Sequence, residues 1–329
     1  MGLSVGIVGL PNVGKSTLFN ALLSKQQAYV ANYPFATIEP NVGIVPVPDE
    51  RLAKLAPIVN TTKLVPATVT FLDIAGLVKG ASQGEGLGNK FLSHIRETDA
   101  IVHVIRAFTD PDIIKQGVTD PKSDFETIQT ELGLADLEMQ EKREKNPPSH
   151  KASEGQVKLA LFADKPYLVA VNVDEGELIR ARELEIMYAE MLGVGVEQIV
   201  IVCAKTEAEL CDLTESEQSE YLRDLGVEES GLARLIKKAY AKLGLMSFLT
   251  AGELEVRAWT VPVGTMAPDA AGVIHTDFVK HFISAKVCSY IDFIEYQGWK
   301  GAAEKGKVRT EGKNYVMKEG DVVEFMIGT

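Results

Sequence analysis

Cysteine is scarce in this sequence, which holds only Cys203, Cys211 and Cys288 among 329 residues. Their spacing fits neither a disulfide framework nor a zinc site, so we expect reduced thiols in a cytoplasmic protein. Long hydrophobic runs are missing as well, because no segment approaches the ~18 apolar residues that a membrane-spanning helix requires. The first residues lack the cationic and apolar regions of a signal peptide, and no membrane partner is expected.

Positive charge is also in deficit, with 34 Lys and Arg against 46 Asp and Glu and a formal net charge of −12. A protein that binds nucleic acid broadly needs a cationic face to release counterions, so this balance argues against broad, non-specific binding, while it does not exclude a local basic patch. Sequence-specific DNA is not expected as a partner either. Hydrophobic residues, in contrast, make up 46% of the chain, which is ample for a folded core. At roughly 100–200 residues per domain, the length allows two or three domains.

Short apolar segments alternate with helical ones through the first 247 residues. We predict strands at 3–8, 69–72, 101–105, 167–171 and 198–202, and helices at 16–24, 89–97, 178–192 and 216–225. This alternation predicts an α/β domain with a mostly parallel sheet flanked by helices. An insertion at about 111–164, with a charged amphipathic helix at 124–145, interrupts it.

The pattern changes near residue 247, and residues 248–329 are predicted to form a small α+β domain. Its expected strands are 256–261, 286–294, 315–317 and 322–327, and a short helix is expected at 276–282.

Residues Gly9 to Ser16, Gly-Leu-Pro-Asn-Val-Gly-Lys-Ser, match the Walker A pattern and stand between a strand and a helix. Gly9 and Gly14 allow the backbone to curl so that its N–H groups face phosphates, and the helix N-terminus favours negative charge. Lys15 is expected to reach the β and γ phosphates, and the Ser16 hydroxyl to bind Mg²⁺. The segment therefore predicts a P-loop nucleoside triphosphatase.

Three further residues are expected around the γ-phosphate. Asp73 ends a predicted strand and begins an Asp-x-x-Gly motif, so it is placed to hold the Mg²⁺ shell while Gly76 N–H meets the γ-phosphate. Thr37 lies between the P-loop and the Asp-x-x-Gly motif, where a switch loop is expected, and is our candidate for the second hydroxyl ligand of Mg²⁺. We thus predict Ser16, Thr37 and Asp73 as metal ligands, and Lys15, Thr37 and Gly76 as the catalytic groups.

Asn172 to Glu175 follow a strand at the position that reads the base. The guanine-specific pattern is Asn-Lys-x-Asp, but here Val173 replaces the lysine and Glu175 the aspartate. Loss of a matched polar contact removes discrimination, so we expect guanine preference to be lost and Asn172 to read adenine. A plain surface turn is the alternative. The residues predicted to contact the nucleotide are Asn12, Val13, Gly14, Lys15, Ser16, Thr17, Asn172, Val173, Glu175, Cys203, Ala204 and Lys205.

Leu77 directly follows the Asp-x-x-Gly motif, where many P-loop hydrolases carry a glutamine that orients the attacking water. Because leucine cannot do this, hydrolysis needs another group, and Asn12 could help to hold a monovalent cation such as K⁺. The glycine-dense segment 80–88 is either a second switch or a merely flexible loop. His94 and His103 are expected to be structural.

A family resemblance rests on the segments 9–16, 32–40, 73–80, 84–89, 172–175, 255–260 and 271–278. Together they resemble the YchF family, the Obg-like ATPases, over nearly the whole chain. The resemblance implies a TRAFAC-class G domain at 1–247, a helical arm inserted in it, and a C-terminal TGS domain with a ubiquitin-like β-grasp fold. It also implies ATP preferred over GTP, slow hydrolysis, association with the large or small ribosomal subunit, and a link to translation and stress responses.

The chain departs from the family in two places. The family's arm is usually a long coiled coil, yet only about forty residues separate Ser123 from Lys165. Lys115 stands where relatives often carry histidine, so we assign it no catalytic role.

Three functions remain open at this point. An ATP-driven switch on the ribosome leads, because the γ-phosphate and Mg²⁺ would order the switch segments until hydrolysis releases them. A GTPase switch that tolerates the altered base motif is the main rival. The third is a binding module in which the nucleotide is structural and the TGS domain binds the partner. A metabolic kinase is disfavoured, because no motif for a second substrate is found.

Overall fold

The computed structural model describes residues 3–32, 41–74, 87–109, 120–145 and 161–328. Thr37, Gly76, Leu77, Lys115 and residues 80–86 of the glycine-dense segment lie outside these residues, whereas α3 begins at Leu87. The chain divides into two compact units, one formed by Met1–Val45 with Val69–Leu243 and the other by Pro46–Thr68 with Gly244–Thr329. Among the described residues, no helix has both the length and the apolar character needed to cross a membrane.

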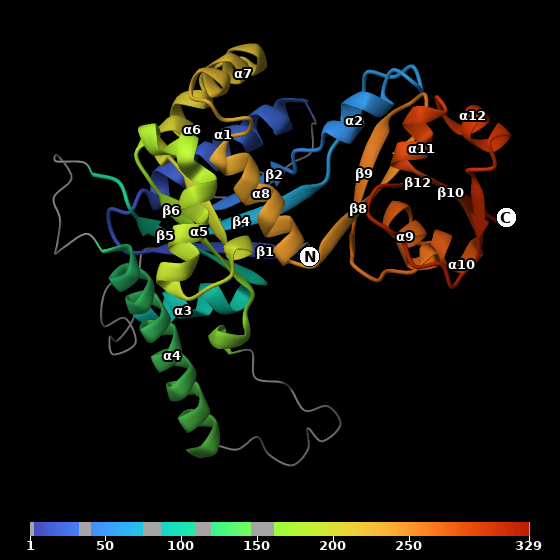
Figure 1. Ribbon diagram of the computed structural model, residues 1–329. Helices are drawn as coiled ribbons and strands as arrows, with labels where there is room; N and C mark the ends of the chain where they lie inside the picture. Colours follow the sequence, from blue (N-terminus) through green and yellow to red (C-terminus); the bar gives the residue numbers. More distant parts are fainter. Residues whose placement is uncertain (1–2, 33–40, 75–86, 110–119, 146–160, 329) are drawn as a thin grey trace. The chain divides into compact units, whose positions relative to one another are not determined.

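The first unit is built on a six-stranded sheet with the order β2-β4-β1-β5-β6-β7 (Figure 1). Its strands are β1 (Ser4–Gly9), β2 (Val42–Pro46), β4 (Thr68–Asp73), β5 (Ala100–Arg106), β6 (Tyr167–Asn172) and β7 (Ile199–Val202). β1 pairs in parallel with β4 and β5, and β6 pairs in parallel with β5 and β7. The five predicted strands of this unit are confirmed, and β2 is an addition.

Every residue of β1, β5 and β7 is buried, as expected for parallel strands covered on both faces. The helices of this unit are α1 (Lys15–Asn32), α3 (Leu87–Glu97), α4 (Pro121–Lys145), α5 (Ala181–Leu192), α6 (Ala204–Leu210), α7 (Glu215–Asp224) and α8 (Gly231–Lys242). Short 3₁₀ turns lie at η1 (Phe162–Asp164), η2 (Glu175–Arg180) and η3 (Val196–Gln198). One core cluster joins α5 to β6 and β7, and another joins α3 and α4 to β1 and β5.

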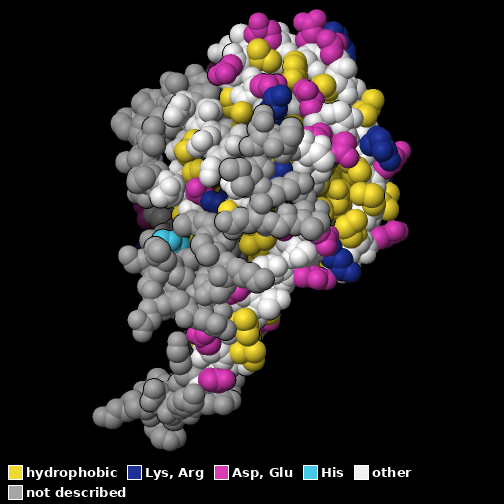
Figure 2. All heavy atoms as spheres, turned by 90° about the vertical axis from the view of Figure 1, so that its left-hand side faces the viewer, with side chains coloured by type: hydrophobic (Ala, Val, Ile, Leu, Met, Phe, Trp, Pro, Cys, Tyr) yellow, Lys and Arg dark blue, Asp and Glu magenta, His cyan; other side chains and the backbone are white. Residues whose placement is uncertain are grey.

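Helix α4 is the described part of the predicted insertion. The expected apolar stripe is present, with Ile128, Leu132 and Ala135 buried against the sheet. Farther along, Leu134 and Leu137 are exposed, and Figure 2 shows hydrophobic side chains among acidic ones on this arm. The arm therefore carries one apolar face into the core and a second, smaller apolar surface outside it.

The second unit holds another six-stranded sheet, with the order β11-β10-β12-β8-β9-β3. Its elements are α2 (Glu50–Leu55), β3 (Leu64–Val65), β8 (Leu245–Ala251), β9 (Val256–Pro262), α9 (Ala267–Ile274), α10 (Phe278–His281), β10 (Phe282–Ser289), α11 (Tyr290–Glu295), α12 (Trp299–Glu304), β11 (Arg309–Glu311) and β12 (Asp321–Ile327). The sheet is mixed, because β12 pairs in parallel with β8 and antiparallel with β10. Helix α9 packs on it through Ala267, Ala270 and Ala271, which gives the predicted β-grasp arrangement.

The structure differs from the sequence-based expectations in several places. Residues 46–68, predicted within the first domain, belong to the second unit, where Leu64 pairs with Val256. The strand predicted at 286–294 is wrong in its second half, because α11 begins at Tyr290 with Ser289 as its N-cap. The segment 315–317 contributes an isolated bridge rather than a strand. The elements that were not predicted are the helices α2, α6, α8, α9 and α12 and the strands β3, β8 and β11.

Candidate functional site

The P-loop leaves the sheet at the carboxyl end of β1 and enters α1 at Lys15. Asn12 and Gly14 both have positive φ, 64° and 89°, which bends the chain tightly between the two elements. A Cβ at Gly14 would collide with the amide of Asn172, and one at Gly9 would lie 2.8 Å from the carbonyl oxygen of Val104. Close packing therefore favours glycine at both positions, and at Gly14 the positive φ favours it as well.

Lys15 and Asp73, one from each of the two predicted motifs, meet in the structure. Asp73 ends β4, which lies beside β1, and its carboxylate forms an ion pair with the Lys15 ammonium. The Lys15 side chain is only 10% exposed, so its charge is held in a fixed direction. Ser16 and Thr17 follow on the first turn of α1 and are exposed. A cation, a carboxylate and two hydroxyls thus lie at the end of two adjacent parallel strands.

A hollow of about 980 Å³ opens over this loop. Of the residues predicted to contact the nucleotide, only Val13 does not line it, because its side chain is buried. The hollow also involves residues that the sequence reasoning missed, namely Leu10, Pro11, Phe108, Thr109, Asp174, Ala208 and Glu209. The volume lies within the ~300–1,000 Å³ range of small-molecule sites.

Asn172, the predicted adenine reader, binds other parts of the chain in this structure. Its Nδ2 donates to the Val13 carbonyl at 2.9 Å, and its Oδ1 accepts from the Ala204 N–H at 2.9 Å. The side chain is 4% exposed. Both polar atoms of the amide are thus engaged by the protein, which ties the P-loop to the loop after β7. The predicted contact of the Asn172 oxygen with adenine is not favoured by this arrangement.

The rest of the Asn172–Glu175 segment is also held by specific partners. Asp174 accepts hydrogen bonds from the Thr109 N–H and hydroxyl, and it caps η2 together with Glu177. The Glu175 carboxylate accepts from the hydroxyl of Tyr221 on α7 at 2.5 Å. This bond and its acidic surroundings raise the pKa of Tyr221 above its ordinary value, so Tyr221 stays a donor. The segment is an ordered wall of the hollow and not a plain surface turn.

Phe108 is the aromatic residue of this wall. The guanidinium of Arg106 lies 4.4 Å from the centre of its ring. An aromatic ring beside carboxylates and a lysine suits a flat, polar-edged ligand such as a nucleobase. The signal that could have revealed Phe108 is its place just after β5, at the carboxyl edge of the sheet.

The residues present fit a Mg²⁺ ion that is shared with bound phosphates. Asp73 and Ser16 supply a carboxylate and a hydroxyl, both hard oxygen donors. Within the described segments, no group of three or more His, Cys, Asp or Glu side chains could hold a metal by itself. Such a sparse donor set matches Mg²⁺, which keeps several waters and takes further ligands from substrate phosphates.

His103 lies in β5, outside the hollow, and is 1% exposed. Its ring makes edge contacts with Phe125 and Tyr167, with ring centres 5.5 and 5.3 Å away. Burial lowers its pKa to about 3, so the imidazole is neutral at ordinary pH. The expectation of a structural role is met.

Comparison with protein families places two models on the chain. Residues 4–144 match the model MMR_HSR1, described as a 50S ribosome-binding GTPase. Residues 245–328 match YchF-GTPase_C, described as a protein of unknown function. The two matches fall on the P-loop unit and on the C-terminal unit.

Curated proteins named "Ribosome-binding ATPase YchF" are similar over the full length. The protein from Bacillus subtilis is 48% identical and that from Escherichia coli O157:H7 is 46% identical, each with 99% of both chains covered. The B. subtilis alignment spans 363 positions against 329 residues here, so at least 34 positions (363 − 329) are internal gaps in this chain.

A solved structure agrees in fold over nearly the whole chain. The structure of the Schizosaccharomyces pombe YchF GTPase is 36% identical, with a TM-score of 0.80, and the match covers 99% of this chain and 98% of that one. With identity at this level over the full length, joined to the geometry of the P-loop, the chain belongs to the YchF family.

Proposed function

We propose that this chain is a Mg²⁺-dependent ATPase that binds the ribosome and works as a nucleotide-driven switch in translation or stress regulation in the cytoplasm. The observation that carries the proposal is the meeting of Lys15 and Asp73 at a P-loop whose Gly9 and Gly14 pack closely against Val104 and Asn172. The ribosome is proposed as a partner because the curated relatives are named ribosome-binding ATPases.

The chain's own groups suggest how the phosphates would be bound. Lys15, paired with Asp73 in this structure, would turn its ammonium to the β and γ phosphates when ATP enters. The Asp73 carboxylate is then released to face the metal site beside the Ser16 hydroxyl. Mg²⁺, when bound, neutralises charge on the phosphate oxygens. Because Lys15 is nearly buried, this exchange of partners takes place with little competition from water.

Base preference is proposed to favour adenine. The Asn-Lys-x-Asp pattern that reads guanine is broken at Val173, which is buried, and at Glu175, whose carboxylate is held by Tyr221. Asn172 is proposed as a positioning residue for the P-loop, since both its amide atoms bind the protein. Thr37 and Gly76 remain candidates for contact with the γ-phosphate.

The first test is competition between ATP and GTP for the Mg²⁺-loaded protein, measured by displacement of a fluorescent nucleotide. Tighter binding of ATP is expected. Asn172→Ala should weaken ATP and GTP alike, by about 10–100-fold for a loss of roughly 1.4–2.7 kcal/mol. Glu175→Asp should instead change the ratio of the two affinities. Glu190→Gln, at an exposed position of α5 that does not line the hollow, is the control.

The competing functions predict other outcomes. Tighter GTP binding would move the protein to a GTPase switch. Stable nucleotide binding with no turnover in wild type or on addition of ribosomes would favour a binding module with a structural nucleotide. Co-sedimentation with ribosomes should be stronger with a non-hydrolysable ATP analogue than with ADP, and Lys15→Ala should remove this difference.

A monovalent cation is proposed to assist hydrolysis. Asn12 is exposed, lines the hollow and has the tight backbone turn that brings it over the loop. Turnover should therefore be faster in K⁺ than in Na⁺ at equal ionic strength. Equal rates in the two salts would remove this part of the proposal.

A further inference from the structure

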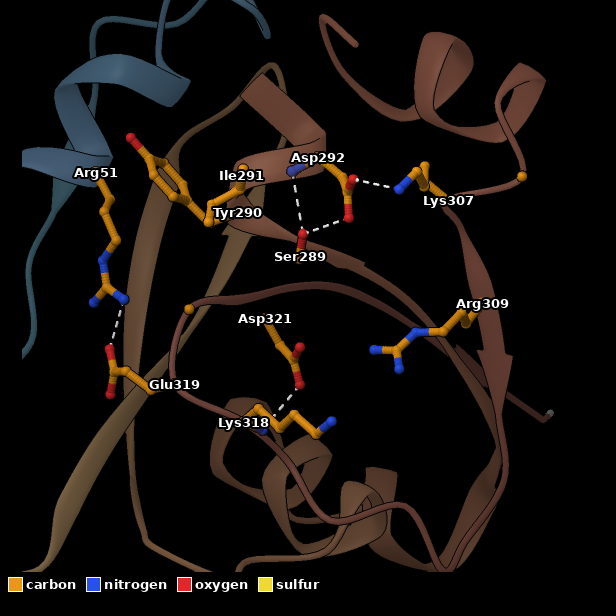
Figure 3. Close-up of a pocket in the computed structure, with 12 residues that line it drawn as sticks. Arg51, Ser289, Tyr290, Ile291, Asp292, Lys307, Arg309, Lys318, Glu319 and Asp321 are labelled. Atoms are coloured by element: carbon orange, nitrogen blue, oxygen red, sulfur yellow. Dashed lines mark hydrogen bonds and ion pairs between the residues drawn. The ribbon is translucent and has the colours of Figure 1, made fainter. Parts of the chain in front are cut away.

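A second hollow, of about 540 Å³, lies wholly within the C-terminal unit. Its walls come from the start of α11, the turn that leads into β11, the turn 318–321 that leads into β12, and Arg51 on α2. It shares no residue with the nucleotide hollow. Figure 3 shows these side chains around the opening.

Cations outnumber carboxylates on these walls, although the whole chain has a net charge of −12. The charged residues are Arg51, Lys307, Arg309 and Lys318 against Asp292, Glu319 and Asp321. A local excess of positive charge in a concave site raises the concentration of anions there.

Two of the four cations are already paired. Arg51 binds Asp49 and also forms an ion pair with Glu319 at 2.6 Å. Lys307 pairs with Asp292 at 3.2 Å. These pairs fix the rim of the hollow and leave little of their charge for a ligand.

Arg309 and Lys318 are the cations that remain. In Figure 3 they extend toward one another from opposite walls, and the Asp321 carboxylate lies beside them. Within the described residues, the Lys318 ammonium has no carboxylate at ion-pair distance. The Arg309 guanidinium donates to the Tyr315 hydroxyl at 3.1 Å, and its Glu311 partner is at 3.6 Å, which leaves donors of the fork free.

Asp321 is the buried carboxylate beside these two cations. It is 3% exposed and accepts from the Tyr315 hydroxyl at 2.8 Å and from the Lys318 N–H at 2.9 Å. Arg309 thus has carboxylates on two sides, Glu311 and Asp321, whereas the Lys318 ammonium has no ion-pair partner among the described residues. The Lys318 charge and the free donors of Arg309 are what the hollow offers to an anion.

The backbone that carries Lys318 is held in place before any ligand arrives. Glu319 accepts from the Ser247 N–H at 2.8 Å, and the Gly320 N–H donates to the Ser247 carbonyl at 2.9 Å. Gly320 has φ 77°, which lets the chain turn sharply there. A cationic site on a preorganised turn loses little entropy on binding.

We propose that this hollow binds a phosphate monoester, with the phosphate bridging Arg309 and Lys318. The arginine fork matches two phosphate oxygens and the lysine supplies a point charge. The volume exceeds one phosphate group and suits a phosphorylated molecule of nucleotide size. The same chemistry is offered by a free sugar phosphate and by the 5′-phosphate of an RNA end.

The test is calorimetric titration of the full chain, saturated with Mg²⁺ and ADP so that the P-loop is filled, with ribose 5-phosphate. Binding is expected for wild type and should weaken at least tenfold in Arg309→Gln and in Lys318→Gln. Lys280→Gln, an exposed lysine on α10 that does not line the hollow, should bind as wild type does. Arg309→Lys should fall between, because it keeps the charge but loses the fork.

Unchanged ADP affinity and melting temperature in each variant show that the fold is intact. The proposal would be overturned if wild type does not bind ribose 5-phosphate, or if Arg309→Gln and Lys318→Gln bind it as tightly as wild type does. A single-stranded RNA hexamer then separates the sources. If its 5′-phosphorylated form binds more tightly than ribose 5-phosphate, the ligand is an RNA end; if it binds no more tightly, the ligand is a small molecule. Equal binding of the 5′-hydroxyl hexamer would contradict recognition of a monoester.

Discussion

At the scale of single residues, hydrogen-bonding capacity determines what Asn172 contributes. This amide is 4% exposed and binds the chain with both its polar atoms, so we propose that it acts on a nucleotide through the loop that it positions. Selectivity must then come from groups that face the hollow, among which Glu175 and Phe108 are the most distinctive.

His103 gives a prediction about pH. Burial lowers its folded-state pKa to about 3, whereas the unfolded chain takes up the proton below the ordinary value of 6.5. Because the unfolded state binds more protons between these values, the free energy of unfolding should fall as the pH drops below 6.5. From pH 7.5 to 5.5 this single group should cost about 1.4 kcal/mol.

Urea unfolding of wild type and His103→Leu at both pH values measures this effect. The variant should lose less stability than wild type over the interval. Equal losses in the two proteins would mean that the buried imidazole is protonated within the fold.

Motif residues were predictable from sequence because each stands directly after an apolar strand. Lys15 and Asp73 follow β1 and β4, so their meeting follows from the adjacency of parallel strands. The bond between Tyr221 and Glu175 could not be foreseen, since the two lie 46 positions apart and Tyr221 belongs to an unremarkable amphipathic helix. The hydrogen-bond partners of Asn172 were missed for the same reason.

At the scale of elements, one side chain joins α4 to the rest of its unit. Asp136 is 6% exposed and accepts from the N–H groups of Phe162 and Ala163, at 2.9 and 3.0 Å. Asp136→Ala leaves these donors without their acceptor, and we expect a loss of about 1–3 kcal/mol in the free energy of unfolding.

Chemical denaturation checks this prediction about α4. Asp136→Asn should lose less, because one acceptor oxygen remains. Gln140→Ala, an exposed change on the same helix, is the control and should be near neutral. A loss in Asp136→Ala as small as the one in Gln140→Ala would contradict the role of Asp136.

Helix α11 illustrates where element prediction fails. Tyr290–Glu295 contains residues that favour strands, and it directly follows β10. The change to helix depends on Ser289, whose hydroxyl accepts from the Asp292 N–H at 3.1 Å. A serine cap is a weak signal inside an apolar run, whereas the isolated, strongly periodic α4 was predicted correctly.

At the scale of the whole molecule, the boundary near residue 247 was predictable, but the share of residues 46–68 in the second unit was not. β3 has only two residues, and its partner β9 begins at Val256. Strand pairing between residues so far apart in the sequence produces no pattern in the local sequence. The 34 or more gap positions in the alignment are proposed to lie in the arm, which is short here compared with the family.

The presence of residues 46–68 in the second unit leads to a prediction. A fragment of residues 244–329 lacks β3 and the ion pairs Lys63–Glu255 and Arg51–Glu319. A peptide of residues 46–68 should raise its melting temperature, by about 4–8 °C for each kcal/mol of binding free energy supplied. Circular dichroism with a scrambled peptide as control measures this. No shift with either peptide would show that 46–68 is dispensable for the unit.

The return of residues 46–68 to the second unit also sets an order of events during synthesis. Val65 leaves the ribosome long before Val256 is made, and at ~5–20 residues per second the interval is roughly 10–40 s. For that time the apolar residues of 46–68 have no strand or helix of their own unit to cover them. We therefore expect the nascent chain to need protection of this segment until its last quarter emerges, and the P-loop unit, whose last residue is Leu243, to be synthesised in full before the second unit.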